Sequence, residues 1–150
     1  MITMNAINEF LAVKELAVAG VSRDKKKFGG MVFQELKEKG YTIFPVNPNA
    51  ETIYDTTCFK SVSDLPASTT NLYIVTPKKH TLEVIKQAVA RGIKNIWIQQ
   101  SSDTPEAIKL CMANNINLIH GECIIMFISP TKSFHKFHKF LRKLFGGMPR

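Results

Sequence analysis

The residues with the clearest chemical potential lie in one segment near the N-terminus, residues 19–30 (AGVSRDKKKFGG), between an apolar run and a helical pattern. A loop that leads from a strand into a helix presents backbone N–H groups and the positive end of the helix dipole, which favour an anion. Gly20 allows a sharp turn, and Gly29 or Gly30 allows close approach of a ligand or a neighbouring strand. The segment predicts a phosphate-binding loop. The plainer alternative is a set of ordinary turn glycines beside a solvated lysine face.

The glycine spacing and the charge of this loop restrict the ligand. An NAD site requires Gly-x-Gly-x-x-Gly and an acidic residue at the end of the second strand. Neither is present here: the gap from Gly20 to Gly29 is too long for this motif, and the second apolar run ends without a carboxylate. No Gly-x-x-x-x-Gly-Lys-Ser/Thr occurs, which excludes a P-loop NTPase. Coenzyme A, with its pyrophosphate and 3′-phosphate, matches a strongly cationic loop, and NADP remains the alternative. The cations are Arg23, Lys25, Lys26 and Lys27.

Short β-type runs alternate with helical patterns along the chain. Strands separated by helices predict βαβ units, and hence a Rossmann-like three-layer α/β/α fold with a five-stranded parallel sheet. The carboxyl ends of such strands share one edge, where ligands bind at the point at which the strand order reverses. The predicted strands are Leu16–Gly20, Thr42–Val46, Leu72–Val75, Asn95–Ile98 and Ile116–Ile119.

The helical patterns have one apolar face each. They predict helices over Phe28–Lys39 and His80–Arg91, and a third that begins at Pro105 with Thr104 as its cap. In this third helix Ile108, Cys111 and Met112 are expected to face the core. The segment 47–68 is predicted to be mostly loop, with one helical turn at 63–65.

Length and composition indicate one compact unit. A chain of 150 residues with 45% hydrophobic content predicts a single domain over 1–130 and a short extension over 131–150. The odd number of cysteines, 3, provides no disulfide framework, and no secretory signal or long apolar run is seen, so a cytoplasmic location is expected. The extension is a basic amphipathic helix that favours self-docking or homodimer contact, with a membrane surface or nucleic acid as the alternative partner.

Several of these segments together resemble the small stand-alone CoA-binding-domain proteins, which are related to the CoA-binding domain of the succinyl-CoA synthetase α-subunit. The resemblance runs from about Leu16 to Ile128. It is carried by Gly20-Val21-Ser22 through Gly29-Gly30, by Gly40 to Asn49 with its Pro45-Val46-Asn47-Pro48 tetrapeptide, by Ile53-Tyr54 and by Ser63-Asp64-Leu65-Pro66.

The resemblance implies a division of the site among the strand ends. The first loop, Gly20 to Arg23, would hold the CoA phosphates; Val46, Asn47 and Pro48 would flank the adenosine, and Val75, Thr76 and Pro77 would line the other side of the nucleotide. Gln99 would face the pantetheine arm, and Cys123 matches a cysteine often present after the fifth strand. The family often has a lysine just after the second strand, where this chain has Asn49-Ala50, so the first-loop lysines are expected to supply that charge.

Candidate catalytic groups are few. Ser22, His80 and Asp103 could be imagined as a triad, but no Gly-x-Ser-x-Gly elbow accompanies them. His135 and His138 have no third ligand nearby, so no metal site is predicted. Cys123 is expected either to meet a pantetheine thiol, forming a mixed disulfide, or to be a small buried side chain.

The sequence therefore predicts a CoA- or acyl-CoA-binding protein that is non-catalytic or regulatory. The alternatives are an NADP-dependent oxidoreductase or its nucleotide-binding subunit, and an interaction protein that uses its basic C-terminal helix. The predicted ligand-binding residues are Gly20, Val21, Ser22, Arg23, Lys26, Lys27, Phe28, Gly29, Val46, Asn47, Pro48, Val75, Thr76, Pro77, Gln99 and Cys123.

Overall fold

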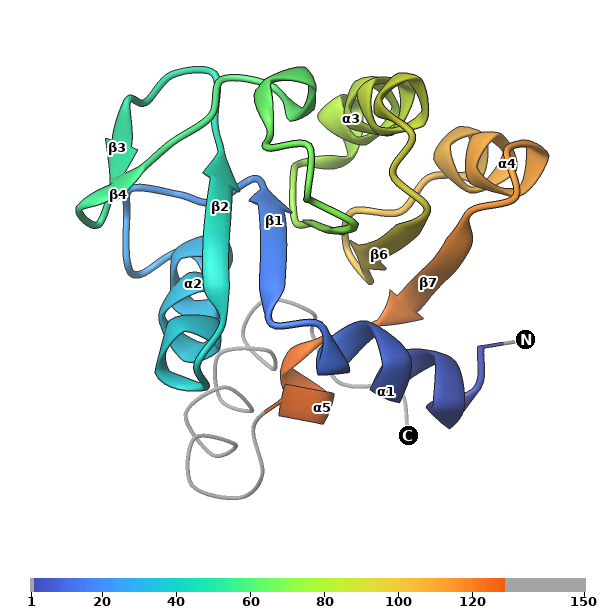
Figure 1. Ribbon diagram of the computed structural model, residues 1–150, viewed down its shortest axis with the longest axis horizontal. Coiled ribbons are helices and arrows are strands. Elements are labelled where there is room, and N and C mark those ends of the chain that lie inside the picture. The colour runs from blue at the N-terminus through green and yellow to red at the C-terminus, as the bar shows by residue number, and fades with distance from the viewer. Residues whose placement is uncertain (1, 129–150) are drawn as a thin grey trace.

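The computed structural model describes residues 2–128 and consists of a parallel sheet covered by helices on both faces (Figure 1). The sheet has five strands in the order β2-β1-β5-β6-β7, and every neighbouring pair is parallel. The strands are β1 (Glu15–Ala19), β2 (Thr42–Val46), β5 (Asn71–Ile74), β6 (Asn95–Gln99) and β7 (Asn117–Glu122). The predicted Rossmann-like α/β fold is confirmed, with strand ends shifted by up to three residues.

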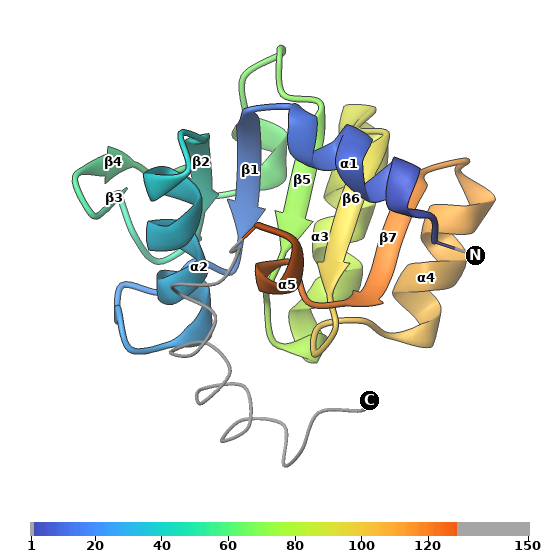
Figure 2. The same ribbon diagram turned by 90° about the horizontal axis from the view of Figure 1, so that it is seen from below.

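Figure 2 shows helices on both faces of the sheet, and these helices bury alternate residues of the strands. The helices α1 (Met4–Ala12), α2 (Phe28–Glu38) and α5 (Ile125–Ile128) pack on one face, together with Val18 and Trp97. The helices α3 (Lys78–Arg91) and α4 (Pro105–Ala113) pack on the other, together with Ala17 and Ile98. Both faces are apolar because both are covered, which explains the continuous apolar runs of the central strands.

Two small elements interrupt the long connection from β2 to β5. The strands β3 (Thr52–Ile53) and β4 (Thr56–Thr57) form a short antiparallel hairpin, and the 3-10 helix η1 (Val62–Asp64) follows it. The hairpin was not predicted, because its turn is made by Tyr54 and Asp55 at positive φ (49° and 63°) rather than by glycine or asparagine. The predicted single helical turn overlaps η1.

The sequence prediction was wrong at two further places. Helix α1 was not predicted, although Thr3 caps it through a bond from the Ala6 N–H and Ile7 and Phe10 are buried beneath it. Met112 was expected in the core but is 69% exposed, because α4 buries its Ala107 and Cys111 side instead. The predicted C-terminal helix over 131–150 lies outside the described residues. Within residues 2–128, no helix has the length and apolar character needed to cross a membrane.

Candidate functional site

A crevice of about 740 Å³ lies at the carboxyl ends of β1, β2 and β5. The sheet order places β2 on one side of β1 and β5 on the other, so the strand order reverses between β1 and β5. Open α/β sheets bind their ligands outside the strand ends at such a reversal. The predicted site residues that line the crevice are Gly20, Val21, Ser22, Lys27, Phe28, Gly29, Val46, Asn47, Pro48, Val75, Thr76 and Pro77.

Two glycines allow the walls of the crevice to meet. Gly20 has a φ of +100°, and a Cβ there would lie 2.6 Å from the Thr76 nitrogen and from the Val75 carbonyl carbon. A Cβ at Gly29 would lie 2.6 Å from the Gly20 carbonyl oxygen. The ends of β1 and β5 and the start of α2 are therefore packed backbone to backbone, which no other residue permits.

The first loop uses part of its hydrogen-bonding capacity on itself. The Asp24 N–H donates to Ser22 Oγ (3.0 Å), the Lys26 N–H to Asp24 Oδ1 (2.9 Å) and the Lys27 N–H to the Asp24 carbonyl (3.1 Å). These three amides of the predicted phosphate-binding loop are therefore bonded within the loop itself. The N–H groups of Val21, Ser22 and Arg23 have no partner within the described chain.

Two helices begin at this crevice, and neither has a side-chain cap. The N-cap residues are Lys27 for α2 and Pro77 for α3, and neither residue caps its helix through its side chain. By contrast, Thr3 caps α1 and Thr104 caps α4, each through its side chain. Uncapped first turns leave backbone donors and a partial positive charge directed at the crevice, which is the arrangement that binds phosphates.

The β2 side of the crevice is held together by Asn47. Its Nδ2 donates to the Val21 carbonyl (3.1 Å), and its Oδ1 accepts from the Asn49 N–H (2.8 Å). Asn47 thus links the first loop to the loop after β2. Because both ends of its amide are engaged, Asn47 acts as a linker between two loops that line the crevice.

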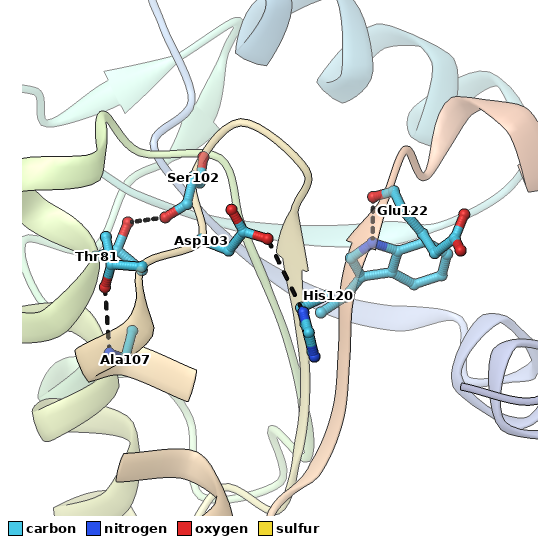
Figure 3. Close-up of polar contacts among 8 residues, drawn as sticks. Thr81, Ser102, Asp103, Ala107, His120 and Glu122 are labelled. Carbon is cyan, nitrogen blue, oxygen red and sulfur yellow. Dashed lines mark hydrogen bonds and ion pairs between the residues drawn. The ribbon is translucent and has the colours of Figure 1, made fainter. Parts of the chain in front are cut away.

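The α3 side contains a buried hydroxyl network. Thr81 Oγ1 donates to the Ser102 carbonyl (2.7 Å), and Thr76 Oγ1 lies 3.0 Å from Thr81 Oγ1 (Figure 3 shows Thr81 and Ser102). Since Thr81 gives its only hydroxyl hydrogen to Ser102, Thr76 must donate to Thr81. Ser102 Oγ in turn donates to the Thr76 carbonyl (2.7 Å). The Thr76 side chain therefore fixes the crevice wall, and its one donor is already used.

Gln99 and Cys123 lie together away from the crevice. Gln99 Oε1 accepts from the Tyr73 hydroxyl (2.8 Å) and from the Ile124 N–H (3.3 Å), and its Nε2 is buried without a partner in the described chain. Cys123 is 6% exposed, and burial raises the pKa of its thiol. Neither side chain lines the crevice. Their contact with the pantetheine arm stays a prediction.

The basic residues of the first loop divide into two groups. Lys27 lines the crevice, whereas Arg23 and Lys26 are exposed outside its lining. Lys25 Nζ lies 5.3 Å from the centre of the Tyr54 ring, whose hydroxyl donates to the Ser22 carbonyl (2.6 Å). Of the four cations in this loop, Lys27 is therefore the one that lines the crevice, and the predicted contacts of Arg23 and Lys26 with phosphate stay predictions.

Other crevice residues were not among the predicted ligand-binding residues. They come from the loop after β2, from the segment after β4, from α3 and from the loop after β6. The polar ones are Asn49, Lys60, His80, Glu83, Gln87, Ser101 and Ser102.

Groups that could react or bind a metal are sparse at this edge of the sheet. His120 Nδ1 lies 3.9 Å from Asp103 Oδ2, which is too long for a hydrogen bond (Figure 3). Neither residue lines the crevice. Within residues 2–128, no three His, Cys, Asp or Glu side chains are grouped closely enough to hold a metal ion.

The fold and the crevice define a Rossmann-like α/β domain with a ligand site at the reversal of its strand order. The chain belongs to the CoA binding domain family, whose model matches residues 14–129. This match confirms the predicted family and supports coenzyme A as the ligand.

Two curated relatives contain a similar region. The chain is 33% identical over 109 residues to acetate–CoA ligase (ADP-forming) II of Archaeoglobus fulgidus, which covers 71% of this chain and 16% of that protein. It is 33% identical over 93 residues to the acetate–CoA ligase (ADP-forming) II subunit alpha of Pyrococcus furiosus, covering 61% of this chain and 20% of that subunit. The chain thus spans a fifth or less of the length of these relatives.

Small solved structures match over nearly their whole length. A conserved hypothetical protein from Pyrococcus furiosus has a TM-score of 0.73 and 31% identity, covering 76% of this chain and 98% of that one. A hypothetical protein from Pyrococcus horikoshii has a TM-score of 0.78 and 28% identity, covering 83% and 89% respectively. The domain therefore also occurs as a small separate protein.

Proposed function

We propose that this protein binds CoA or an acyl-CoA in the crevice between β1 and β5 and does not itself transform it. The observation that carries the proposal is the pair of helices, α2 and α3, that begin at the crevice without side-chain caps. In this proposal the pyrophosphate lies at the start of α2, where it accepts from the free N–H groups of Val21–Arg23 and pairs with Lys27.

The same geometry supports a role in binding rather than in catalysis. The hydroxyls of Thr76 and Ser102 are engaged in the network that joins two loops, and no hydrogen bond of the described chain joins a crevice hydroxyl to a histidine. Cys123 is buried outside the crevice with a raised pKa, so it is largely protonated at neutral pH. A bound thioester would therefore meet no activated nucleophile among these groups.

Isothermal titration of the purified chain tests the proposal, with CoA, acetyl-CoA, NADP and NAD as separate ligands. CoA and acetyl-CoA are expected to bind. NAD, which carries no further phosphate on a ribose hydroxyl beyond its pyrophosphate, is expected to bind more weakly. Tighter binding of NADP than of CoA would favour the oxidoreductase alternative. Release of free thiol from acetyl-CoA during incubation with the protein would contradict the non-catalytic part.

A pair of lysine variants connects binding to the crevice. Lys27→Gln is expected to lower CoA affinity about fivefold to tenfold, because it removes one charge-assisted contact to phosphate. Lys86→Gln serves as the control, since Lys86 is an exposed residue of α3 outside the crevice lining. Equal affinities of the two variants would argue against the placement of the pyrophosphate.

A further inference from the structure

The crevice lining of residues 2–128 contains two lysines, which reach it from different parts of the chain. Lys27 comes from the first loop and precedes α2, whereas Lys60 comes from the segment that follows β4. CoA likewise carries two separate anionic groups, a pyrophosphate and a ribose 3′-phosphate. The proposed function assigns Lys27 to the pyrophosphate and leaves Lys60 without a role.

The backbone around Lys60 is fixed beside the end of β2. The Asn47 N–H donates to the Phe59 carbonyl (2.9 Å) and the Phe59 N–H to the Pro45 carbonyl (2.8 Å), so Phe59 pairs with Val46 as an isolated parallel bridge. On the other side of Lys60, the Val62 N–H donates to Gln87 Oε1 of α3 (3.0 Å). In Figure 1 the chain returns from β4 toward the tip of β2 before it enters η1.

This position corresponds to the ribose in nucleotide-binding sheets of this type. A group near the end of the second strand contacts the ribose hydroxyls in such folds, and a cation nearby accommodates a phosphate carried on the ribose. Here β2 ends at Val46, no carboxylate follows in the sequence before Glu51, and Lys60 is the cation that the bridge brings to this end.

Lys60 is also electrostatically available. No carboxylate of the described residues lies within salt-bridge distance of its ammonium group. The one ion pair among the described residues joins His120 and Asp103. Three cations of the first loop, Arg23, Lys25 and Lys26, are less suited to bind an anion in the crevice. They do not line it, and the carboxylate of Asp24 lies among them in the sequence. Glu83, which does line the crevice, is the nearby group that opposes an anion.

We infer that Lys60 holds the ribose 3′-phosphate, and that this contact makes the crevice discriminate CoA from 3′-dephospho-CoA. The inference rests on the proposed function and goes further, because it assigns the phosphate specificity to one side chain. It also replaces the expectation that the first-loop lysines supply this charge.

The test is a set of titrations of the full chain at low ionic strength with CoA and with 3′-dephospho-CoA. The wild type is expected to prefer CoA. Lys60→Gln is expected to lower CoA affinity about fivefold to tenfold while leaving 3′-dephospho-CoA affinity within about twofold, because it removes one partly exposed ion pair. Lys60→Arg should retain the preference. Lys86→Gln is the matched control, since Lys86 is an exposed lysine outside the crevice, and Lys26→Gln tests whether the first loop supplies the charge instead.

The outcomes separate this inference from the proposed function. If the wild type binds both ligands equally, or if Lys60→Gln weakens both equally, Lys60 does not read the 3′-phosphate although CoA binding stands. If Lys26→Gln removes the preference and Lys60→Gln does not, the first loop supplies the charge and the inference is overturned. Failure of the wild type to bind either ligand would overturn the proposed function as well.

Discussion

Replacement of Gly29 by alanine tests whether the contact between the first loop and α2 sets both stability and ligand binding. The added Cβ would lie 2.6 Å from the Gly20 carbonyl oxygen, where Cβ atoms are essentially never found closer than 3.0 Å. The two segments must therefore separate by at least 0.4 Å, the difference between these distances. Both partners are backbone, so neither can move aside by a change of rotamer.

The expected loss of stability follows from two opposing effects. Overpacking of this kind costs about 1–3 kcal/mol, while alanine stabilises a helix interior relative to glycine by up to about 1 kcal/mol. A net loss of about 1–2 kcal/mol lowers the melting temperature by about 2–8 °C for a chain of this size. Since the displaced loop carries the free N–H groups of Val21–Arg23, CoA affinity is expected to fall about tenfold or more, the effect of losing one hydrogen bond to a charged group.

Gly92→Ala provides the matched control. Gly92 caps α3 with a φ of +80° and has nothing within 4 Å of an added Cβ, so its replacement costs backbone strain of about 1–2 kcal/mol without a clash. The two variants should melt at similar temperatures, as followed by circular dichroism, yet only Gly29→Ala should lose CoA affinity in a titration well below its melting temperature. A Gly29→Ala protein with wild-type affinity would refute the reasoning.

Three further predictions follow from other contacts. Glu83→Gln removes the carboxylate that lines the crevice and should raise CoA affinity about twofold to fivefold at low ionic strength, with the gain vanishing in high salt; titrations at two salt concentrations check this, and an unchanged affinity would contradict it. Thr104→Ala removes the bond from the Ala107 N–H (3.2 Å) and should cost about 1 kcal/mol, which thermal melting would detect, while CoA affinity stays unchanged because Thr104 does not line the crevice. Burial raises the pKa of Cys111 from 9.0 to about 11. The unfolded chain therefore loses the thiol proton at a lower pH than the folded chain, and the free energy of unfolding falls as the pH rises from about 9 through 11. Urea midpoints should decline over this range, and they should decline less steeply in Cys111→Ala.

The sheet could be predicted because its strands are short, apolar and separated by helices with one buried face. The N-terminal helix α1 carried a readable signal as well, since Thr3 precedes it and Ile7 and Phe10 are spaced on one face. The sequence of the β3–β4 hairpin carried no such signal. Its strands are two residues long, and its turn at Tyr54 and Asp55 contains no glycine and has a tyrosine, which is not typical of positive φ.

The candidate site was predictable where topology alone decides it. The ends of β1, β2 and β5 must meet at one edge, and the residues that follow them do line the crevice. Gln99 was assigned to the pantetheine arm from resemblance, yet strand alternation indicates its face: Ile96 and Ile98 pack beneath α3 and α4, whereas Trp97 packs on the opposite side. Gln99 therefore shares the face of Trp97, where it meets Tyr73.

Lys60 shows what a sequence cannot reveal at all. Its place in the crevice depends on a single bridge between Phe59 and Val46, formed across a connection that contains a hairpin. No periodicity marks such a bridge, because one residue pair has no period. The sequence analysis consequently assigned the positive charge for the ribose phosphate to the lysine-rich first loop, where three of the four cations lie outside the crevice.

The caps of the helices distinguish structural helix starts from those that face a ligand. Threonine side chains cap α1 and α4 away from the crevice, whereas α2 and α3 begin at the crevice without such a cap. Suitable capping side chains do precede α2, but Ser22 and Asp24 accept bonds from within the first loop instead. A helix without its cap gives up about 1 kcal/mol, and a phosphate group that accepts from its first turn would restore that stabilisation. In the proposed function, ligand binding therefore completes the first turns of these two helices.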